Sequence, residues 1–299
     1  MISVVYFGAH QFSAPILEAV IKSGLFDVKL VITQPDRPVG RKQELQISPV
    51  KAVALKYNIP VEQPTTLKNY ALPITTDVNI VSKYGLLIPE SILSSAKYGS
   101  INDHASLLPK YRGATPIQTA LINGDTETGV TIMQMDKDLD HGAILSQQII
   151  TILPNDTCAE LSERLAPIEA ELLIKTVADF VEGKIKPQEQ NHEAATFCRE
   201  FTREDGEIKW DKTAVEIYNL YRGLTPWPGI WTVWQGKRLK LLEIKQSTET
   251  IQTGKISAQN GKLLAGCSDG NAIEILKVQM EGKGPVDAKN FINGFKNLL

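Results

Sequence analysis

The stretch that decides the fold is Ile2–Gly8 (ISVVYFG), a run rich in β-branched and aromatic residues that predicts a buried strand. Apolar residues at helical spacing follow from Ile16 to Ile21, and Gly24 ends that predicted helix. Lys29–Thr33 predicts a second strand. Strand, helix and strand at this spacing are typical of a doubly wound, mostly parallel α/β sheet.

The same alternation continues to residue 180. We expect helices from Ser48, over Thr115–Ile122 and over Cys158–Phe180, and strands at Val78–Val81, just before His104 and at Gly129–Met135. In Rossmann-like sheets of this kind, ligands bind beyond the carboxyl ends of the strands. A functional site is therefore expected at that edge.

A change of pattern after Gly183 indicates a second domain. The next residues are polar, lack a clear period and include Pro187, which predicts a linker. A helical pattern and five short strands separated by Gly and Asn follow, which favours a small OB-like β-barrel. We therefore expect an N-terminal α/β domain at 1–184, a linker at 185–202 and a C-terminal domain at 203–299.

Composition limits the class of protein. The 299 residues are 42% hydrophobic and 22% charged, as in soluble globular proteins, and the net charge of −2 gives no overall positive field. The apolar runs are much shorter than the ~18–20 residues of a membrane span. Three cysteines and no signal-like start predict a cytoplasmic protein. Because the sequence has no obvious long apolar seam for packing against a second copy, we expect a monomer.

Common enzyme motifs are missing from the sequence. The first strand is not followed by Gly-x-Gly-x-x-Gly, and the Walker, His-Glu-x-x-His and Gly-x-Ser-x-Gly motifs do not occur. None of the four histidines pairs with a cysteine at ligand spacing, so we expect no metal.

The polar residues best suited to catalysis are Asn102 and His104. Two residues apart on a strand, they point to the same face. An amide that stabilises an oxyanion beside an imidazole that moves protons is suited to acyl transfer. Asp136, Asp138 or Asp140 could supply the carboxylate that such an imidazole needs. The spacing alone equally allows His104 to end a strand and Asn102 to make a turn.

Several longer motifs resemble those of the folate-dependent formyltransferases. They are Asn102–Pro109 (NDHASLLP), Arg112–Gln118 (RGATPIQ), Gly129–Asp136 (GVTIMQMD) and Leu139–Gly142 (LDHG). Others resemble the members of that family that act on initiator methionyl-tRNA: Thr33–Arg41, Ser48–Lys51, Pro226–Gly229 (PWPG), Glu281–Lys283 and Phe291–Gly294. The resemblance runs from Phe7 almost to the C-terminus and is weakest in the linker.

The resemblance implies a catalytic set of Asn102, His104 and Asp140, with 10-formyltetrahydrofolate as the formyl donor. It also implies two donor-binding segments. Their residues are Ser106, Leu107, Leu108 and Pro109, and Tyr84, Gly85, Leu86 and Ile88.

The acceptor implied by the resemblance is the α-amine of methionine on initiator tRNA, attacked without a covalent enzyme intermediate. In the family, the loop at Asp36–Pro49 reaches the tRNA, and a basic strand in the second domain could contact phosphates. The expected tRNA-binding residues are Arg37, Arg41, Lys42, Lys237, Arg238 and Lys240, with Lys51 as a further candidate. Trp227 is expected to pack at a turn, with a stacking platform as the alternative.

Five residues depart from the family pattern: Lys83, Asp103, Gln43, Glu44 and His141. Asp103 should point away from Asn102 and His104, into the sheet's packing layer. Because an unpaired buried carboxylate is costly, we expect Asp103 to have a partner or to be partly exposed.

Three other functions remain open at this point. The first is the same transfer to another amine, such as an amino sugar nucleotide. The second is a catalytically silent protein that binds tRNA or folate. The third is a formyltetrahydrofolate hydrolase, in which water takes the place of the amine.

Overall fold

The computed structural model describes residues 1–39 and 44–298 of the chain. Backbone contacts divide these residues into two compact units. The first contains 1–116, 127–151 and 162–199, and the second contains 117–126, 152–161 and 200–299. The division at 184 and 203 expected from sequence stays a prediction, because the chain crosses between the units more than once.

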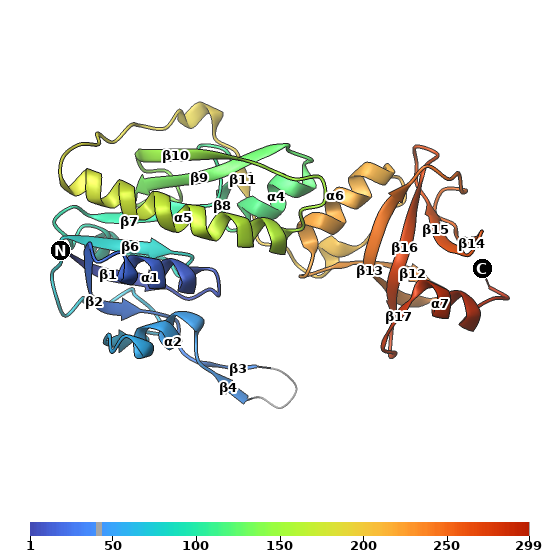
Figure 1. Cartoon of the computed structure of the whole chain (residues 1–299), viewed down its shortest axis with the longest axis horizontal. Helices are drawn as coiled ribbons and strands as arrows, with labels where there is room; N and C mark the ends of the chain where they lie inside the picture. The colour runs from blue at the N-terminus through green and yellow to red at the C-terminus, as the bar shows by residue number, and fades with distance from the viewer. Residues whose placement is uncertain (40–43, 299) are drawn as a thin grey trace. The chain divides into compact units, whose positions relative to one another are not determined.

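The first unit is built on a seven-stranded sheet with the order β10-β9-β7-β6-β1-β2-β5 (Figure 1). The strands are β1 (Ile2–Gly8), β2 (Phe26–Ile32), β5 (Val61–Glu62), β6 (Val78–Ser82), β7 (Ser100–His104), β9 (Glu127–Gln134) and β10 (Ile144–Thr151). The five neighbouring strands β7, β6, β1, β2 and β5 are parallel to one another. Strand β9 is antiparallel to both of its neighbours, β7 and β10. The predicted mostly parallel α/β sheet is confirmed.

Helices α1 (Ser13–Lys22) and α5 (Cys158–Val181) lie in front of the sheet in Figure 1. Their apolar stripes are buried, as the spacing predicted; Leu17 and Leu173 have no exposed surface. The shorter helices are α2 (Pro49–Lys56), α3 (Glu90–Leu93) and α4 (Pro116–Ile122). Helix α2 begins where expected, because the Ser48 hydroxyl accepts a hydrogen bond from the Lys51 N–H.

A β-hairpin, which the sequence did not predict, occupies the long connection after β2. Strands β3 (Arg37–Val39) and β4 (Glu44–Gln46) pair antiparallel on either side of residues 40–43. The predicted tRNA-binding residues Arg41 and Lys42 fall at 40–43 and lie outside the described residues.

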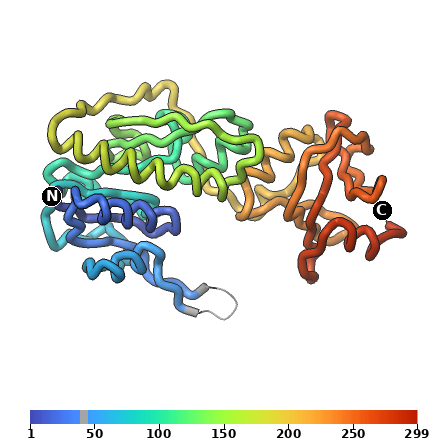
Figure 2. Tube along the Cα trace, viewed as in Figure 1, coloured from blue at the N-terminus to red at the C-terminus, as the bar shows by residue number. Residues whose placement is uncertain are grey.

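The segment after α5 stays with the first unit. In Figure 2 it is the yellow part of the tube, which runs back alongside β10. Ile144 and Gln188 form an antiparallel bridge, a 3₁₀ turn covers His192–Ala194, and β11 (Phe197–Cys198) pairs with β8 (Arg112–Gly113). Residues 185–199 are thus hydrogen-bonded to the rest of the first unit rather than free between domains.

The second unit contains the five antiparallel strands expected from sequence, in the order β12-β13-β16-β15-β14. The strands are β12 (Ile230–Trp234), β13 (Lys237–Ser247), β14 (Ile256–Gln259), β15 (Lys262–Gly266), β16 (Ala272–Met280) and the short β17 (Pro285–Asp287). Helices α6 (Ala214–Leu224) and α7 (Ala288–Gly294) pack against them, around a core that includes Leu239, Leu263 and Ile275. Closure of this sheet into an OB-like barrel stays a prediction. Within the described residues, no helix is long and apolar enough to cross a membrane.

Candidate active site

The site begins at the carboxyl end of β7, next to the end of its parallel neighbour β6. Asn102 and His104 lie on the same face of β7, as their spacing predicted. Both are nearly buried, with 9% and 6% of their surfaces exposed. An amide and an imidazole therefore share a largely desolvated location at the edge where ligands bind in such sheets.

The two ring nitrogens of His104 have different surroundings. Nε2 lies 2.9 Å from the backbone carbonyl oxygen of Tyr111, and Nδ1 lies 3.7 Å from Oδ2 of Asp140. Because a carbonyl oxygen can only accept, Nε2 carries a hydrogen and donates it. The proton that the ring gains or loses is then the one at Nδ1, on the side of Asp140.

Of the three candidate carboxylates, Asp136, Asp138 and Asp140, it is Asp140 that lies beside His104. Its Oδ2 also accepts a hydrogen bond of 2.7 Å from the backbone N–H of Gly113. Its backbone is left-handed, with a φ of 48°, which is uncommon outside glycine. Asp136 pairs with His141 instead, and Asp138 is exposed.

The Asn102 amide forms no side-chain hydrogen bond within residues 1–39 and 44–298. Asn102 is not among the described residues whose fully buried polar atoms lack a partner, so its amide reaches the open side of the site. Its donor hydrogens are therefore available to a bound oxygen. Asn102, His104 and Asp140 together offer a hydrogen-bond donor, a proton carrier and a carboxylate at one point.

The two predicted donor-binding segments extend from neighbouring strands. Tyr84–Pro89 follows β6, and Ser106–Pro109 follows β7, so both lie at the same edge of the sheet. Tyr84 is buried in the core beneath, and burial raises the pKa of its phenol to about 12. Leu87, by contrast, is 86% exposed. Ile88, Ser106 and Leu108 are buried, Leu86, Leu107 and Pro109 are partly buried, and Gly85 is exposed with a φ of 77°.

The opposite face of β7 carries a buried charge cluster, made of Asp103, Lys83 and Glu169. Lys83 Nζ lies 2.5 Å from Glu169 Oε2, and Asp103 Oδ2 accepts a hydrogen bond of 2.8 Å from the Ser82 hydroxyl. Burial raises the pKa of Asp103 to about 7, with Glu169 adding to the effect and Lys83 opposing it. The expectation that Asp103 has a partner is confirmed. Two departures from the family pattern, Lys83 and Asp103, thus belong to one cluster.

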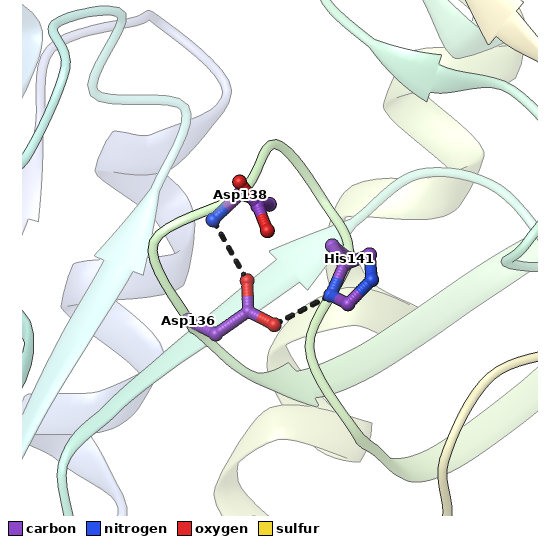
Figure 3. Close-up of side chains that lie close together, drawn as sticks. All are labelled: Asp136, Asp138 and His141. Carbon is purple, nitrogen blue, oxygen red and sulfur yellow. Dashed lines mark hydrogen bonds and ion pairs between the residues drawn. The ribbon is translucent and has the colours of Figure 1, made fainter. Parts of the chain in front are cut away.

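The third departure, His141, lies in a group of possible metal ligands on the loop between β9 and β10 (Figure 3). Asp136 accepts hydrogen bonds from the Asp138 N–H at 2.9 Å and from His141 at 2.6 Å. Side chains of this group are one-third or more exposed and already bonded to one another. These bonds already engage Asp136 and His141, and the expectation of a metal-free site stays a prediction. The sequence signal for it was the i, i+2, i+5 spacing of ligand types.

The candidate tRNA-binding residues lie in two separate places. Arg37 is exposed on β3, whereas Lys51 is held by Asp36 at 2.5 Å and Gln63 at 2.7 Å and so secures the base of the hairpin. Arg238 and Lys240 lie on the outer face of β13. Lys237, at the start of the strand, alternates with Arg238 and so lies on the opposite face. Arg238 lies 3.9 Å above the ring of Trp231.

Two further residues differ from what the sequence indicated. Trp227 lies in a turn, as expected, but its side chain is 57% exposed, so the expectation that it packs there is wrong. His192 had no predicted role, yet its Nδ1 lies 2.9 Å from Arg112 Nη2 and its ring stacks on His141 at 3.9 Å. Gln190, beside it, contacts the Asp140 loop directly and was also missed. A polar residue in an aperiodic segment gives no sequence signal for such a contact.

Comparisons with known proteins identify the family of both parts of the chain. Residues 1–177 match the formyl transferase family, and residues 200–296 match the formyl transferase C-terminal domain family. The methionyl-tRNA formyltransferase of Caldicellulosiruptor saccharolyticus is 43% identical over 98% of this chain and 97% of its own. That of Enterococcus faecalis is 42% identical over 98% and 96%.

Solved structures share the fold at lower identity. An N-formyltransferase from Helicobacter canadensis, in complex with folinic acid and dTDP-3-aminofucose, matches with a TM-score of 0.70 and 22% identity over 94% of this chain and all of its own. A sugar 3-N-formyl transferase matches with a TM-score of 0.69 and 20% identity over 95% of this chain and 99% of its own. The resemblance found in the sequence is thereby confirmed, and the chain belongs to the formyl transferase family, among the methionyl-tRNA formyltransferases.

Proposed function

We propose that the protein transfers the formyl group of 10-formyltetrahydrofolate to the α-amine of methionine on initiator methionyl-tRNA. The observation that carries this function is the near full-length identity of 42–43% to proteins of that activity. The convergence of His104 and Asp140 within 3.7 Å supports a working active site rather than a silent binding protein.

The chemistry needs a donor toward the formyl oxygen and a route for one proton. In our proposal the amine nitrogen attacks the formyl carbon, and the Asn102 amide donates to the oxygen as it gains charge. His104, protonated at Nδ1, adds a second donor. The new C–N bond replaces the bond to the folate nitrogen, which takes up a proton as the amine loses one.

Asp140 supports the ring of His104 in this scheme. Its carboxylate faces Nδ1, the nitrogen whose proton is exchanged, while the Tyr111 carbonyl fixes the ring through Nε2. Asp140 also assists proton removal from the amine through water. The hydrogen bond at Nε2 keeps the ring in one orientation, while the 3.7 Å between Nδ1 and Asp140 leaves the N–H at Nδ1 free to donate to the formyl oxygen.

The folate is proposed to lie over Tyr84–Pro89 and Ser106–Pro109. The two segments leave adjacent parallel strands at one edge, and they present apolar surface there, with Leu87 largely exposed. A flat pterin ring has the shape and polarity to cover such a surface. Asn102 and His104 lie between these two segments in the sequence, at the end of β7. A folate bound over the segments would therefore bring its formyl group close to both side chains.

The tRNA is proposed to contact Arg37 on β3, Arg41 and Lys42, which lie outside the described residues, and Lys237, Arg238 and Lys240 on β13. Exposed basic side chains bind phosphates and give binding that weakens as salt rises. The exposed indole of Trp227 adds a surface on which a base can stack. We propose that residues 203–299 act as the tRNA-binding domain, that residues 1–184 carry the catalysis, and that the protein works as a cytoplasmic monomer.

One assay tests the acceptor directly. The protein is incubated with 10-formyltetrahydrofolate and either charged initiator tRNA, an amino sugar nucleotide or water alone, and formyl transfer is followed. We expect formylmethionyl-tRNA and tetrahydrofolate in equal amounts, with the other two arms at the level of a His104→Ala control. Faster transfer to the sugar nucleotide, or hydrolysis in the water arm, would overturn the proposal.

A further inference from the structure

The segment after α5 contacts the catalytic loop through one buried side chain. We propose that Gln190 is a positioning residue, which holds Asp140 in place so that its carboxylate meets His104. This inference rests on the proposed function, since it assigns Gln190 to the same reaction. It gives residues 185–199 a part in catalysis, where the sequence indicated only a linker.

The Gln190 amide bonds both ends of the turn that contains Asp140. Its Nε2 donates to the carbonyl oxygen of Asp140 at 2.9 Å and to that of Gly142 at 2.7 Å. Gln190 is only 5% exposed, so water competes little for these bonds. Both donor hydrogens of the amide are used on the backbone of one short turn.

Arg112 fixes which way the Gln190 amide faces. Its Nη2 and Nε lie 2.8 Å and 3.3 Å from Gln190 Oε1, and a guanidinium can only donate. The oxygen of the amide therefore faces Arg112, and the nitrogen faces the turn. Arg112 is itself buried, and its other Nη2 contact is to Nδ1 of His192.

The same short strand holds the Asp140 side chain. Gly113, the residue after Arg112, donates its N–H to Asp140 Oδ2 at 2.7 Å. Strand β8 is in turn paired with β11 in the segment after α5. Asp140 is thus held twice, by Gly113 at its carboxylate and by Gln190 at its backbone carbonyl.

The turn needs such support because of its backbone. Asp140 has a φ of 48°, a left-handed conformation that is uncommon outside glycine, although aspartate adopts it more readily than most residues. Its carboxylate lies 3.7 Å from His104 Nδ1, so a small relaxation would separate the two groups. Misplacement of a catalytic group by ~1 Å can slow a reaction about 100-fold.

Gln190→Met tests the contact, and Gln188→Met is its matched control. Met has nearly the size of Gln but no donors, and Gln188 has an exposed side chain, with only its backbone paired to Ile144. We expect Gln190→Met to lower kcat about 10–100-fold, to leave the KM for the folate within about 3-fold, and to change the pH profile of kcat. Gln188→Met should match the wild type in all three.

A second substitution covers the case in which Gln190→Met does not fold. Gln190→Glu keeps the size of the side chain and an oxygen for Arg112 but removes the donors to Asp140 and Gly142. It should remain folded by circular dichroism and lose kcat to a similar extent. A purely structural role for Gln190 would instead lower the melting temperature and leave kcat and its pH profile unchanged.

Asp140→Asn separates this inference from the function on which it rests. If Asp140→Asn keeps full activity, the proposed role of Asp140 fails. If Asp140→Asn is inactive while Gln190→Met and Gln190→Glu both keep the wild-type kcat and pH profile, the positioning role of Gln190 alone is overturned.

Discussion

The two faces of β7 use polar residues in opposite ways. On one face Asn102 and His104 stand where two adjacent parallel strands end, with Asp140 beside the imidazole. On the other face Asp103 lies under helix α5, within the buried charge cluster. All of these side chains are nearly buried, so burial alone does not tell the two faces apart.

The difference lies in where the hydrogen-bonding capacity is directed. The Asn102 amide has no partner in the described part of the chain, and His104 keeps Nδ1 for exchange. In the charge cluster Lys83, Glu169 and Asp103 face each other, and only Asp103 Oδ1 and Glu169 Oε1 lack a partner among the described residues. We therefore expect substitutions on the first face to change rate and those on the second to change stability.

The largest effect should come from His104→Ala. Removing the proton carrier should lower kcat by several orders of magnitude, at least about 10³-fold, since general acid–base catalysis contributes ~10²–10⁴ and a donor to the oxyanion is also lost. The melting temperature should change little. Near-normal turnover at saturating donor would contradict the role of His104.

Lys83→Met should give the largest loss of stability. It leaves Glu169 and Asp103 buried without a cation, and breaking a buried ion pair in this way costs about 3–5 kcal/mol. The free energy of unfolding is measured in urea. The double variant Lys83→Met/Glu169→Gln should recover part of the loss, because it also removes a buried charge. A double variant no more stable than Lys83→Met would show that the pair is not the cause.

Asp103→Asn should change how stability depends on pH. The pKa of Asp103 is raised by burial to about 7, above its usual 3.8, so the folded state holds the proton more tightly than the unfolded chain. Stability is then lost as the pH rises from about 4 to about 7. The groups facing Asp103 are Ser82, Lys83, Glu169 and Tyr6.

Urea unfolding at pH 5 and pH 8 measures this dependence. The wild type should lose about 3 kcal/mol more than Asp103→Asn between the two pH values, because about two pH units of the window lie above pH 5 and each is worth about 1.4 kcal/mol. The same loss in both proteins would mean that Asp103 does not titrate there.

The smallest effect is expected at Lys240 on the outer face of β13. Lys240→Ala should raise the KM for charged tRNA about 2–5-fold at 0.15 M salt and lower the salt dependence of binding by about one phosphate contact. The control is Lys245→Ala, because Lys245 is paired with Glu274 at 3.2 Å. An equal change in both variants, or a change in the KM for the folate, would argue against a phosphate contact.

Local patterns in the sequence predicted much of the fold and part of the site. The alternation along β7 placed Asn102 and His104 on one face, and the Ser48-Pro49 pair marked the start of α2. The antiparallel pairing of β9 with β7 was not predictable, since a buried strand has the same pattern in either direction. Strand β10 was also not predicted, because its buried and exposed residues do not alternate regularly.

Contacts between distant residues were beyond the reach of the sequence. Lys83 and Glu169 are 86 residues apart, and nothing local to either indicates the other. Gln190 lies in a polar, aperiodic segment whose backbone bonds go to other loops. The approach of Asp140 to His104 was predicted only through the family resemblance, because spacing left three aspartates open.

The central claim is that His104 and Asp140 act as one unit on the formyl group. It is tested by kcat for formyl transfer to charged initiator tRNA in His104→Ala, Asp140→Asn and the double variant, at saturating substrates. Residues that act as a unit give losses that do not multiply. The account predicts that the double variant is as slow as His104→Ala, within about 3-fold. Losses that multiply, or an Asp140→Asn variant as fast as the wild type, would contradict it.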